Sequence, residues 1–333
     1  MSRRLRGLLI AASALLVLAA AGAGGVWHFA RIYLSSPGPL RQNAVVDLPR
    51  GDGVSAIAAR LAAAGAIDHP LAFAALARSL NKDRALKAGE YELAPGMSPE
   101  AIIALLESGK VLLHPVQVPE GLTVREIYAL LQASEVLTGD LPPLPPEGSL
   151  MPSTYLVPRG EPRAKVVERM RAAMAAELER AWTGRRPDLP LRTPEEALIL
   201  ASIIEKETSR PEEYGLVAAV FANRLRRGMP LQTDPTVIYA LTDGRGPLGR
   251  ELTRADLTVD NPYNTYLLPG LPPGPIASPG ADALAAAVAP AVVDYLYFVA
   301  DGSGGHAFAA TLSEHNRNVA KWRKLRDGAR APG

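Results

Sequence analysis

The sequence contains no cysteine and only five histidines among its 333 residues. Without cysteine the chain can form no disulfide, and it has neither a thiol nucleophile nor a thiolate metal site. The histidines are scattered, and none of them stands in an HExxH or similar metal-binding spacing. We therefore predict no metal site.

The chain also lacks a large excess of charge of either sign. Lysine and arginine total 36 against 34 aspartates and glutamates, which leaves a net charge of +2. This balance gives no basis for a nucleic-acid partner. Hydrophobic residues make up 48% and charged residues 21%, so a sizeable core is possible and wholesale disorder is not expected. The length suffices for two compact domains plus extensions.

A long apolar run stands near the N-terminus. Residues 7–30 carry no charge and follow Arg3, Arg4 and Arg6. About 20 apolar residues span a bilayer as a helix, and flanking arginines favour the cytoplasmic side. We predict that residues 1–31 form a cytoplasmic tip and a single-pass anchor in the inner membrane, with the rest of the chain on the periplasmic side.

The alternative interpretation of this run is a cleaved signal peptide. Residues 19–25 are small enough for a signal peptidase. The run is longer than an ordinary signal core, however, and Trp27 and Tyr33 suit the membrane interface. We therefore favour a retained anchor, and in either case the rest of the chain leaves the cytoplasm.

Two segments rich in proline and glycine predict the domain boundaries. Residues 32–44 are predicted to be a linker, which would reach only ~40 Å when fully extended. The folded part would then work close to the membrane surface. Residues 140–149, DLPPLPPEGS, predict a second linker. These boundaries leave a small subdomain at 45–139 and a final domain at 150–328.

The small subdomain repeats one theme, in which a short apolar strand and a turn lead to an amphipathic helix. Two of its segments, MSPEAIIALLESGK and LTVREIYALLQAS, resemble each other and suggest duplicated units. Tyr91 and Tyr128 could contact a ligand, but core packing is the favoured interpretation for both. The predicted strands are 45–48, 89–93 and 111–118, and the predicted helices are 54–64, 70–80, 98–109 and 122–134.

The final domain is predicted to be mainly helical, with one β-hairpin. Arg224, Arg226 and Arg227 are interpreted as the solvated end of a helix, where cations are favoured. His315 is expected to cap or pack the last helix. The predicted helices are 165–182, 193–209 and 212–227, and the hairpin joins 294–300 to 306–311. The fold class is therefore α+β, with an N-terminal transmembrane helix.

The helix at 193–209, TPEEALILASIIEKETS, carries the main chemical signal. Thr193 is a candidate cap, with Glu196 placed for a capping box. At 100° per residue Glu207 falls between Leu200 and Ile203, on the apolar face. Glu205 falls on a less bulky face, between Leu198 and Ala201. Ser202 and Lys206 mark the predicted polar stripe.

Two effects should raise the pKa of Glu207. Apolar neighbours disfavour the charged form, and the negative end of the helix dipole acts in the same direction. A raised pKa suits a general acid near neutral pH. The alternative is an ordinary ion pair between Glu207 and Arg210 at the end of the helix.

Polar side chains in two further segments are candidate substrate contacts. Gln232, Thr233 and Asp234 stand just before a proline and a new helix, so Thr233 or Asp234 could equally serve only as a cap. Residues 261–280, NPYNTYLLPGLPPGPIASPG, are predicted to form a rigid loop that lines a binding groove. Its amide donors and aromatic rings suit a carbohydrate or a peptide as ligand. Its candidate contacts are Asn261, Tyr263, Asn264 and Tyr266.

Four segments together resemble a known family. SIIEKET, VFANRLRRGMPLQTDPTVIYAL, NPYNTYLLPGLPPGPIASPG and YLYFVADGSGGHAF follow one another between about residues 198 and 318. They closely resemble the membrane-bound endolytic murein transglycosylases, also called YceG-like proteins. The single N-terminal anchor agrees with this family. Residues 45–134 more weakly resemble the LysM-like portion that precedes the catalytic domain there.

The resemblance implies cleavage within peptidoglycan glycan strands. The bond is the β-1,4 link between N-acetylmuramic acid and N-acetylglucosamine, and the product carries a 1,6-anhydro end. The resemblance makes Glu207, the second acid of EKE, the catalytic residue. It implies no cofactor, and it implies peptidoglycan synthases as partners. Glu205 is a candidate support for Glu207, through its pKa or its packing.

Two other functions remain open on the sequence alone. A lysozyme-type muramidase would hydrolyse the same bond and leave reducing ends rather than anhydro ends. A catalytically silent glycan-binding anchor could instead position synthases. A short linker to the membrane further predicts action on newly made strands, which a lengthened linker should impair.

Overall fold

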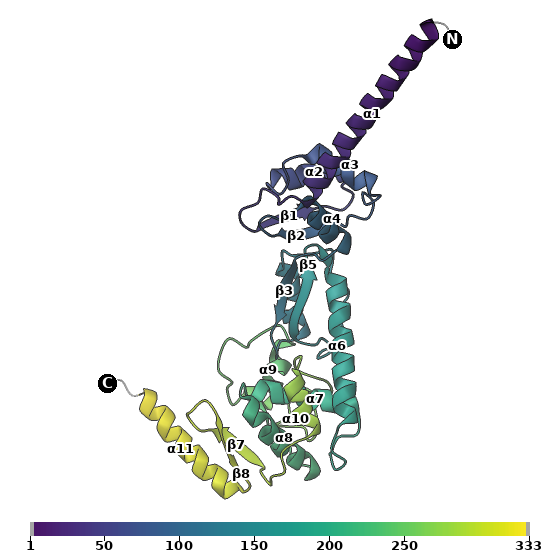
Figure 1. The fold of residues 1–333 in the computed structure, drawn as a ribbon. Coiled ribbons are helices and arrows are strands. Elements are labelled where there is room, and N and C mark those ends of the chain that lie inside the picture. The colour runs from purple at the N-terminus through teal and green to yellow at the C-terminus, as the bar shows by residue number, and fades with distance from the viewer. Residues whose placement is uncertain (1–2, 331–333) are drawn as a thin grey trace. The chain divides into compact units, whose positions relative to one another are not determined.

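The apolar N-terminal run forms one helix, α1 (Arg3–Ser35), in the computed structural model, which describes residues 3–330 and the side chains of residues 13–327 (Figure 1). Its Ser13–Ser35 stretch is long and apolar enough to cross a membrane and is not covered by protein. This is consistent with the predicted anchor, and a signal sequence near the N-terminus meets the same criterion of length and hydropathy. The arginines at 3, 4 and 6 lie outside the described side chains, so the orientation stays a prediction.

The chain divides into two compact units, one ending at His114 and the other beginning at Pro115. In the first unit β1 and β2 pair antiparallel, with Val46 opposite Tyr91. The inward residues of both strands pack on the helices to form one core, in which Tyr91 is fully buried. Its elements lie close to their predicted positions: β1 (Ala44–Leu48), α2 (Val54–Ala63), α3 (Pro70–Ser79), β2 (Gly89–Leu93) and α4 (Pro99–Ser108).

The segment predicted as a free linker, residues 32–44, is instead part of this first unit. α1 continues to Ser35, and the Tyr33 hydroxyl donates a hydrogen bond to the carbonyl of His69 at 3.2 Å. Gly38 lies so close to the neighbouring turn that a Cβ there would stand 2.4 Å from the carbonyl oxygen of Met97. The predicted extended tether is therefore wrong, because the segment packs against the unit that it precedes.

The first part of the second unit surrounds a core that runs across the predicted boundary at 140–149. β3 (Leu113–Val118) pairs with β5 (Ser153–Pro158), and Tyr128, on the helix after β3, packs in the same core. The proline-rich segment lies over this core, since the Tyr128 hydroxyl donates to the carbonyl of Pro143 at 3.1 Å. The remaining elements here are α5 (Val124–Ala133), β4 (Leu137–Thr138), β6 (Glu161–Pro162) and α6 (Arg163–Thr183).

The rest of the second unit is a cluster of helices with a C-terminal hairpin. A second core gathers the buried faces of α6, α7, α8 and α10. The hairpin was predicted, and its strands pair antiparallel with Phe298 opposite Phe308. Helix α10 was not predicted from the sequence. The elements are α7 (Pro194–Glu207), α8 (Pro211–Arg226), α9 (Asp234–Thr242), η1 (Asp256–Thr258), α10 (Ala281–Val288), β7 (Tyr297–Ala300), β8 (His306–Ala309) and α11 (Leu312–Arg330).

Candidate functional site

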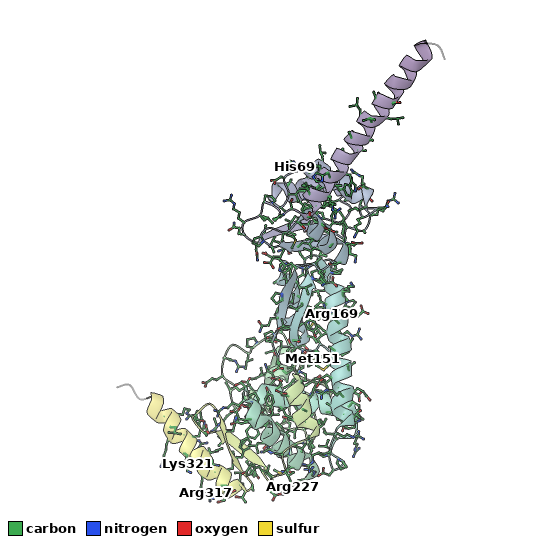
Figure 2. The ribbon with its side chains drawn as sticks, in the orientation of Figure 1. His69, Met151, Arg169, Arg227, Arg317 and Lys321 are labelled. Carbon is green, nitrogen blue, oxygen red and sulfur yellow. The ribbon has the colours of Figure 1, made fainter. Side chains whose placement is uncertain are left out.

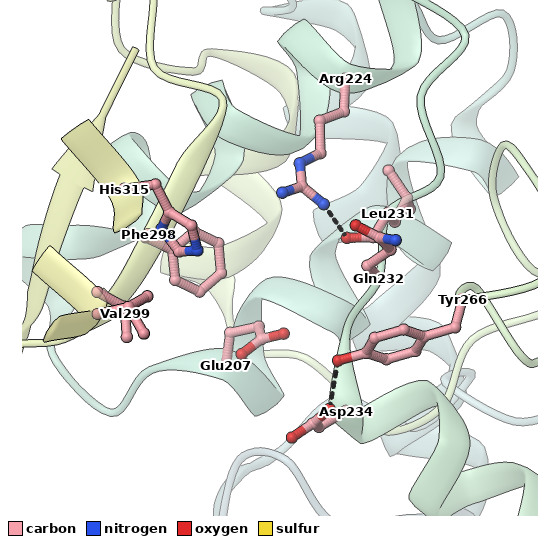
Figure 3. Close-up of a pocket in the computed structure, with 10 residues that line it drawn as sticks. Glu207, Arg224, Leu231, Gln232, Asp234, Tyr266, Phe298, Val299 and His315 are labelled. Carbon is pink, nitrogen blue, oxygen red and sulfur yellow. Dashed lines mark hydrogen bonds between the residues drawn. The ribbon is translucent and has the colours of Figure 1, made fainter. Parts of the chain in front are cut away.

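Helix α7 delivers Glu207 to the wall of a pocket. The helix begins as predicted, because Thr193 Oγ1 accepts a hydrogen bond from the backbone N–H of Glu196 at 3.2 Å. Leu200 and Ile203, which flank Glu207 on the helical wheel, are fully buried. Glu207 is the last residue of α7 and lines a pocket of about 400 Å³ in the second unit (Figure 3).

The electrostatic surroundings of Glu207 agree with the prediction. Its pKa is raised to about 7, chiefly because burial desolvates the carboxyl and also because of the nearby charge of Asp234. The Thr233 hydroxyl and the charges of His306 and Arg224 oppose this rise. The side chain is only partly covered, because the carboxyl opens to the pocket. Glu207 is therefore a carboxyl that is half protonated near neutral pH.

The alternative interpretation, an ion pair between Glu207 and Arg210, is not found in the structure. Arg210 instead reaches Glu212, at 3.3 Å, and Glu213, at 3.9 Å. Both partners lie on the first turn of α8, so the guanidinium is turned away from α7. A helix-end ion pair with Arg210 therefore does not explain why a glutamate stands at position 207.

Two other predictions for α7 need correction or limitation. Ser202, which was predicted to lie on the polar stripe, is fully buried: its hydroxyl donates to the carbonyl of Ile199 and accepts from the N–H of Ile276.

Glu205 does not line the pocket with Glu207. Its two oxygens accept hydrogen bonds from the Tyr214 hydroxyl at 3.0 Å and from the N–H of Gly280 at 2.9 Å. Glu205 thus ties α7 to its neighbours, which agrees with a packing role.

Asp234, Gln232 and Tyr266 do line the pocket with Glu207. The Tyr266 hydroxyl donates to Asp234 Oδ1 at 2.6 Å, which fixes the carboxylate (Figure 3). Thr233 occupies the N-cap of α9, but its side chain does not cap the helix. Its buried hydroxyl makes no hydrogen bond of ordinary geometry within residues 3–330, although its nearness lowers the pKa of Glu207.

The backbone at Gln232 adopts an unusual conformation. Its φ of 51° is in the left-handed region, which costs energy for a residue with a side chain. The turn is held by two hydrogen bonds to Thr265, from the N–H of Gln232 to the carbonyl and from the N–H of Thr233 to the hydroxyl. The strained turn lies beside Asp234 and Tyr266, where it shapes the pocket wall.

The other loop candidates are not brought into the pocket. Asn264 is fully buried, and its amide nitrogen donates to the carbonyls of Leu257 and Val259 at 3.1 and 2.9 Å. Tyr263 packs its ring on Tyr239, with ring centres 4.8 Å apart. These two side chains order the 261–280 loop. Asn261 acts in the same way, since its Oδ1 accepts the N–H of Tyr263.

Arg224 is the main residue that the sequence analysis misplaced. It was predicted to be solvated, yet it is 8% exposed and lines the pocket opposite Glu207 (Figure 3). Val217, Val220 and Phe221 lie seven, four and three residues earlier and are buried. Arg224 therefore continues the inward face of α8. This helical spacing could have predicted that Arg224 is buried. The three arginines were instead interpreted together as a solvated basic helix end.

His315 on α11 is the second unpredicted lining residue. Its ring stacks on Tyr297, with centres 5.1 Å apart, and burial together with the charge of Arg224 lowers its pKa. Phe298 and Val299 of β7 complete this wall. Within residues 3–330, no group of three or more histidine, aspartate or glutamate side chains is placed to hold a metal ion.

Comparisons with known proteins agree with this architecture. The chain is 33% identical to the endolytic murein transglycosylase of Streptococcus pneumoniae strain D39 over 93% of its own length, and it spans 64% of that relative. It is 32% identical to the endolytic murein transglycosylase of Bacillus subtilis strain 168, covering 83% of this chain and 84% of the relative. A crystal structure of a putative YceG-like protein from Listeria monocytogenes matches with a TM-score of 0.53 at 31% identity, over 83% of this chain and 99% of that one. The YceG-like family matches residues 46–321, and the chain therefore belongs to this family.

Proposed function

We propose that this protein is an endolytic peptidoglycan lytic transglycosylase with Glu207 as its catalytic acid and base. It would cleave the β-1,4 bond between N-acetylmuramic acid and N-acetylglucosamine inside glycan strands and leave 1,6-anhydro ends. The observation that carries the proposal is a carboxyl with a pKa raised to about 7, open to a pocket lined by polar side chains. The names of the relatives from Streptococcus and Bacillus support the same activity.

The chemistry needs only one carboxyl that can both give and take a proton. Protonated Glu207 donates its proton to the glycosidic oxygen, and the N-acetylglucosamine residue leaves with that oxygen. The C6 hydroxyl of the muramyl residue attacks the anomeric carbon, and the Glu207 carboxylate takes the hydroxyl proton. No water is consumed, and the acid is regenerated. A pKa near the working pH serves both transfers.

The attached hydroxyl must react before water does. An intramolecular nucleophile can reach an effective molarity of ~10⁵ M or more when it is held in the right geometry. The pocket residues best placed to hold the sugar ring are Gln232, Asp234 and Tyr266. Asp234 is also better placed than Glu205 to stabilise positive charge at the anomeric carbon, since Glu205 is bonded elsewhere. The 261–280 loop, ordered by Asn264, supports Tyr266 from behind.

One observation favours a hydrolytic alternative. Asp234 is a second carboxylate in the same pocket, and ordinary glycosidases use two carboxylates. A muramidase would use Asp234 to activate water or to attack the sugar, and its products would carry reducing ends.

Digestion of purified murein by the wild type and by Glu207→Gln decides among these functions. The proposal expects anhydro-ended fragments of internal length from the wild type and none from the folded variant. Reducing ends would establish the muramidase instead. Equal cell-wall phenotypes of the two forms in cells, with no cleavage in vitro, would leave only a glycan-binding anchor.

The first unit fits a supporting role in this proposal. Its strand–helix–helix–strand order, with β1 and β2 paired, supports the LysM-like expectation of glycan binding. Because residues 32–44 pack on this unit, glycan binding by the unit would occur directly after the apolar helix. We therefore propose action on strands close to the membrane, together with synthases as partners.

A further inference from the structure

Arg224 is a mostly buried cation that forms no direct salt bridge among the described side chains, although the charge of Glu207 acts on it across the pocket. Its Nε donates to the carbonyl of Leu296 at 2.7 Å, and Nη1 donates to the carbonyls of Leu231 and Pro230 at 2.8 and 3.2 Å. Within residues 3–330 it forms no ion pair and Nη2 makes no hydrogen bond. A buried charge is costly unless an opposite charge or a full set of hydrogen bonds compensates it. Nη2 is therefore a strong donor to which no described protein group offers an acceptor, and it is left to the contents of the pocket.

The guanidinium is held so that this free nitrogen faces the pocket. The centre of the Tyr297 ring lies 5.3 Å from Cζ of Arg224, and the three hydrogen bonds to backbone carbonyls fix the plane of the guanidinium. Figure 3 shows the side chain reaching from α8 into the space between His315 and Gln232. Desolvation lowers the pKa of Arg224, but a guanidinium keeps its charge at neutral pH because its ordinary pKa is above 12.

The pocket is thereby divided by charge. Glu207 and Asp234 form an acidic side. Arg224 is the only arginine or lysine among the lining residues. An anionic group on a bound sugar would be repelled by the two carboxylates and attracted to the guanidinium. Such an arrangement selects orientation as well as affinity.

We propose that Nη2 of Arg224 binds a carboxylate carried by the muramyl residue, either on the lactyl group or on the stem peptide attached to it. This inference rests on the proposed function. Of the two sugars in the strand, only the muramyl residue carries such a group. Arg224 is then a specificity residue that sets the register of the glycan, so that the anomeric carbon of a muramyl residue faces Glu207.

The test uses the full chain in detergent or nanodiscs with four glycans. Two carry stem peptides, either with free carboxylates or with these carboxylates amidated. The other two are stripped of peptides, with the lactyl carboxylates either free or amidated. For each glycan, kcat/KM is measured by mass analysis of the cleavage products. We expect amidation to lower wild-type kcat/KM about 10-fold or more in one pair, as loss of a charge-assisted hydrogen bond does. The pair that responds identifies the stem peptide or the lactyl group as the source.

The same ratios are measured in Arg224→Gln and in Arg227→Gln. Arg227 is exposed at the outer end of α8 and loses the same charge, so it is the matched control (Figure 2). We expect Arg224→Gln to cleave free and amidated glycans at equal rates and Arg227→Gln to keep the wild-type ratio. If Arg224→Gln fails to fold, the wild-type ratios of kcat/KM on free and amidated glycans still test whether a carboxylate is recognised.

Equal wild-type rates on all four glycans would overturn the inference while leaving the transglycosylase proposal intact. A carboxylate preference that persists in folded Arg224→Gln would also overturn it. Absence of cleavage on every glycan would instead refute the proposed function on which the inference depends.

Discussion

His306 Nδ1 lies 2.7 Å from Oε2 of Glu213, and the N–H of His306 donates to Oε1 of the same carboxylate at 2.9 Å. This pair joins the β7–β8 hairpin to the first turn of α8. The Thr208 hydroxyl donates to Oε2 at 3.0 Å, and Thr208 directly follows Glu207. One buried carboxylate therefore holds both the hairpin wall and the backbone that carries the proposed acid.

Glu213→Gln should weaken the fold in a pH-dependent way. Burial alone would raise the pKa of Glu213, but hydrogen bonds from the His306 side chain and backbone and from Thr208 hold it below 4.5, the ordinary value. The stabilisation is present above the ordinary pKa and is lost as pH falls through the lower folded pKa. We expect thermal unfolding to show a lower midpoint for Glu213→Gln at pH 7 and a smaller difference at pH 3. Glu212→Gln, its exposed neighbour, should unfold like the wild type at both pH values.

The activity should fall on the alkaline side of neutrality. Glu207 must hold a proton to begin the reaction, and its pKa is about 7. We expect kcat/KM on murein to decrease with rising pH above about 7, in a profile that follows one ionisation. An alkaline limb that appears only above pH 9 would contradict the role of Glu207 as acid.

Removing the Glu207 charge should stabilise the protein. The folded pKa of about 7 lies above the ordinary 4.5, so stability is lost as pH rises through this interval. The cost is at most about 3 kcal/mol at 1.36 kcal/mol per pKa unit, and smaller because the carboxyl opens to water in the pocket. We expect Glu207→Gln to unfold at a higher temperature than the wild type at pH 8 and by a smaller margin at pH 5.

Tyr266→Phe should reduce turnover with little effect on stability. The lost hydroxyl fixes Asp234, which is exposed and can be solvated by water, so we expect a cost of about 1 kcal/mol or less in unfolding free energy. A several-fold drop in kcat is expected because Asp234 then moves freely. Tyr263→Phe changes a neighbouring loop residue that does not line the pocket, and it should retain wild-type kcat. Equal losses in the two variants would refute the assignment of Tyr266.

Gln232 allows strain and function to be separated. Gln232→Gly relieves the left-handed backbone and should keep or raise stability by up to about 1 kcal/mol. Gln232→Ala keeps the strain and loses only the amide. We expect both variants to raise KM for murein to a similar extent, while only the glycine variant gains thermal stability. Wild-type KM in both would exclude the amide as a substrate contact.

Short-range signals predicted much of the fold. The helices predicted at 122–134 and 98–109 are confirmed, since Thr123 and Glu126 form a capping box at the start of α5 and Ser98 caps α4. Such contacts depend only on residues within one turn. The burial of the Glu207 neighbours followed from helical geometry in the same way. The family resemblance then selected Glu207 from the acids that the chain offers.

Long-range packing accounts for the errors. α10 was missed because its alanine-rich segment, ADALAAAV, is buried on most sides and has no clear polar face. His315 was expected to cap or pack the last helix, and it does pack on Tyr297. Its place in the pocket lining was missed because nothing local brings α11 to the pocket. The helical spacing placed Arg224 on the inward face of α8, but the sequence did not show that acceptors lie there, because one of them, the carbonyl of Leu296, stands 72 residues away.

The pairing of β3 with β5 determines where the protein can be cut. A fragment that begins at Leu150 would lose Val116, Val118 and Ile127, and it would leave the inner side of β5 and α6 uncovered. Such a fragment should aggregate even though it contains Glu207 and the whole pocket. A fragment that begins at Pro115 keeps this core whole. Limited proteolysis should therefore not cleave the proline-rich segment at 140–149. Its composition alone would instead predict an exposed linker that is cleaved first.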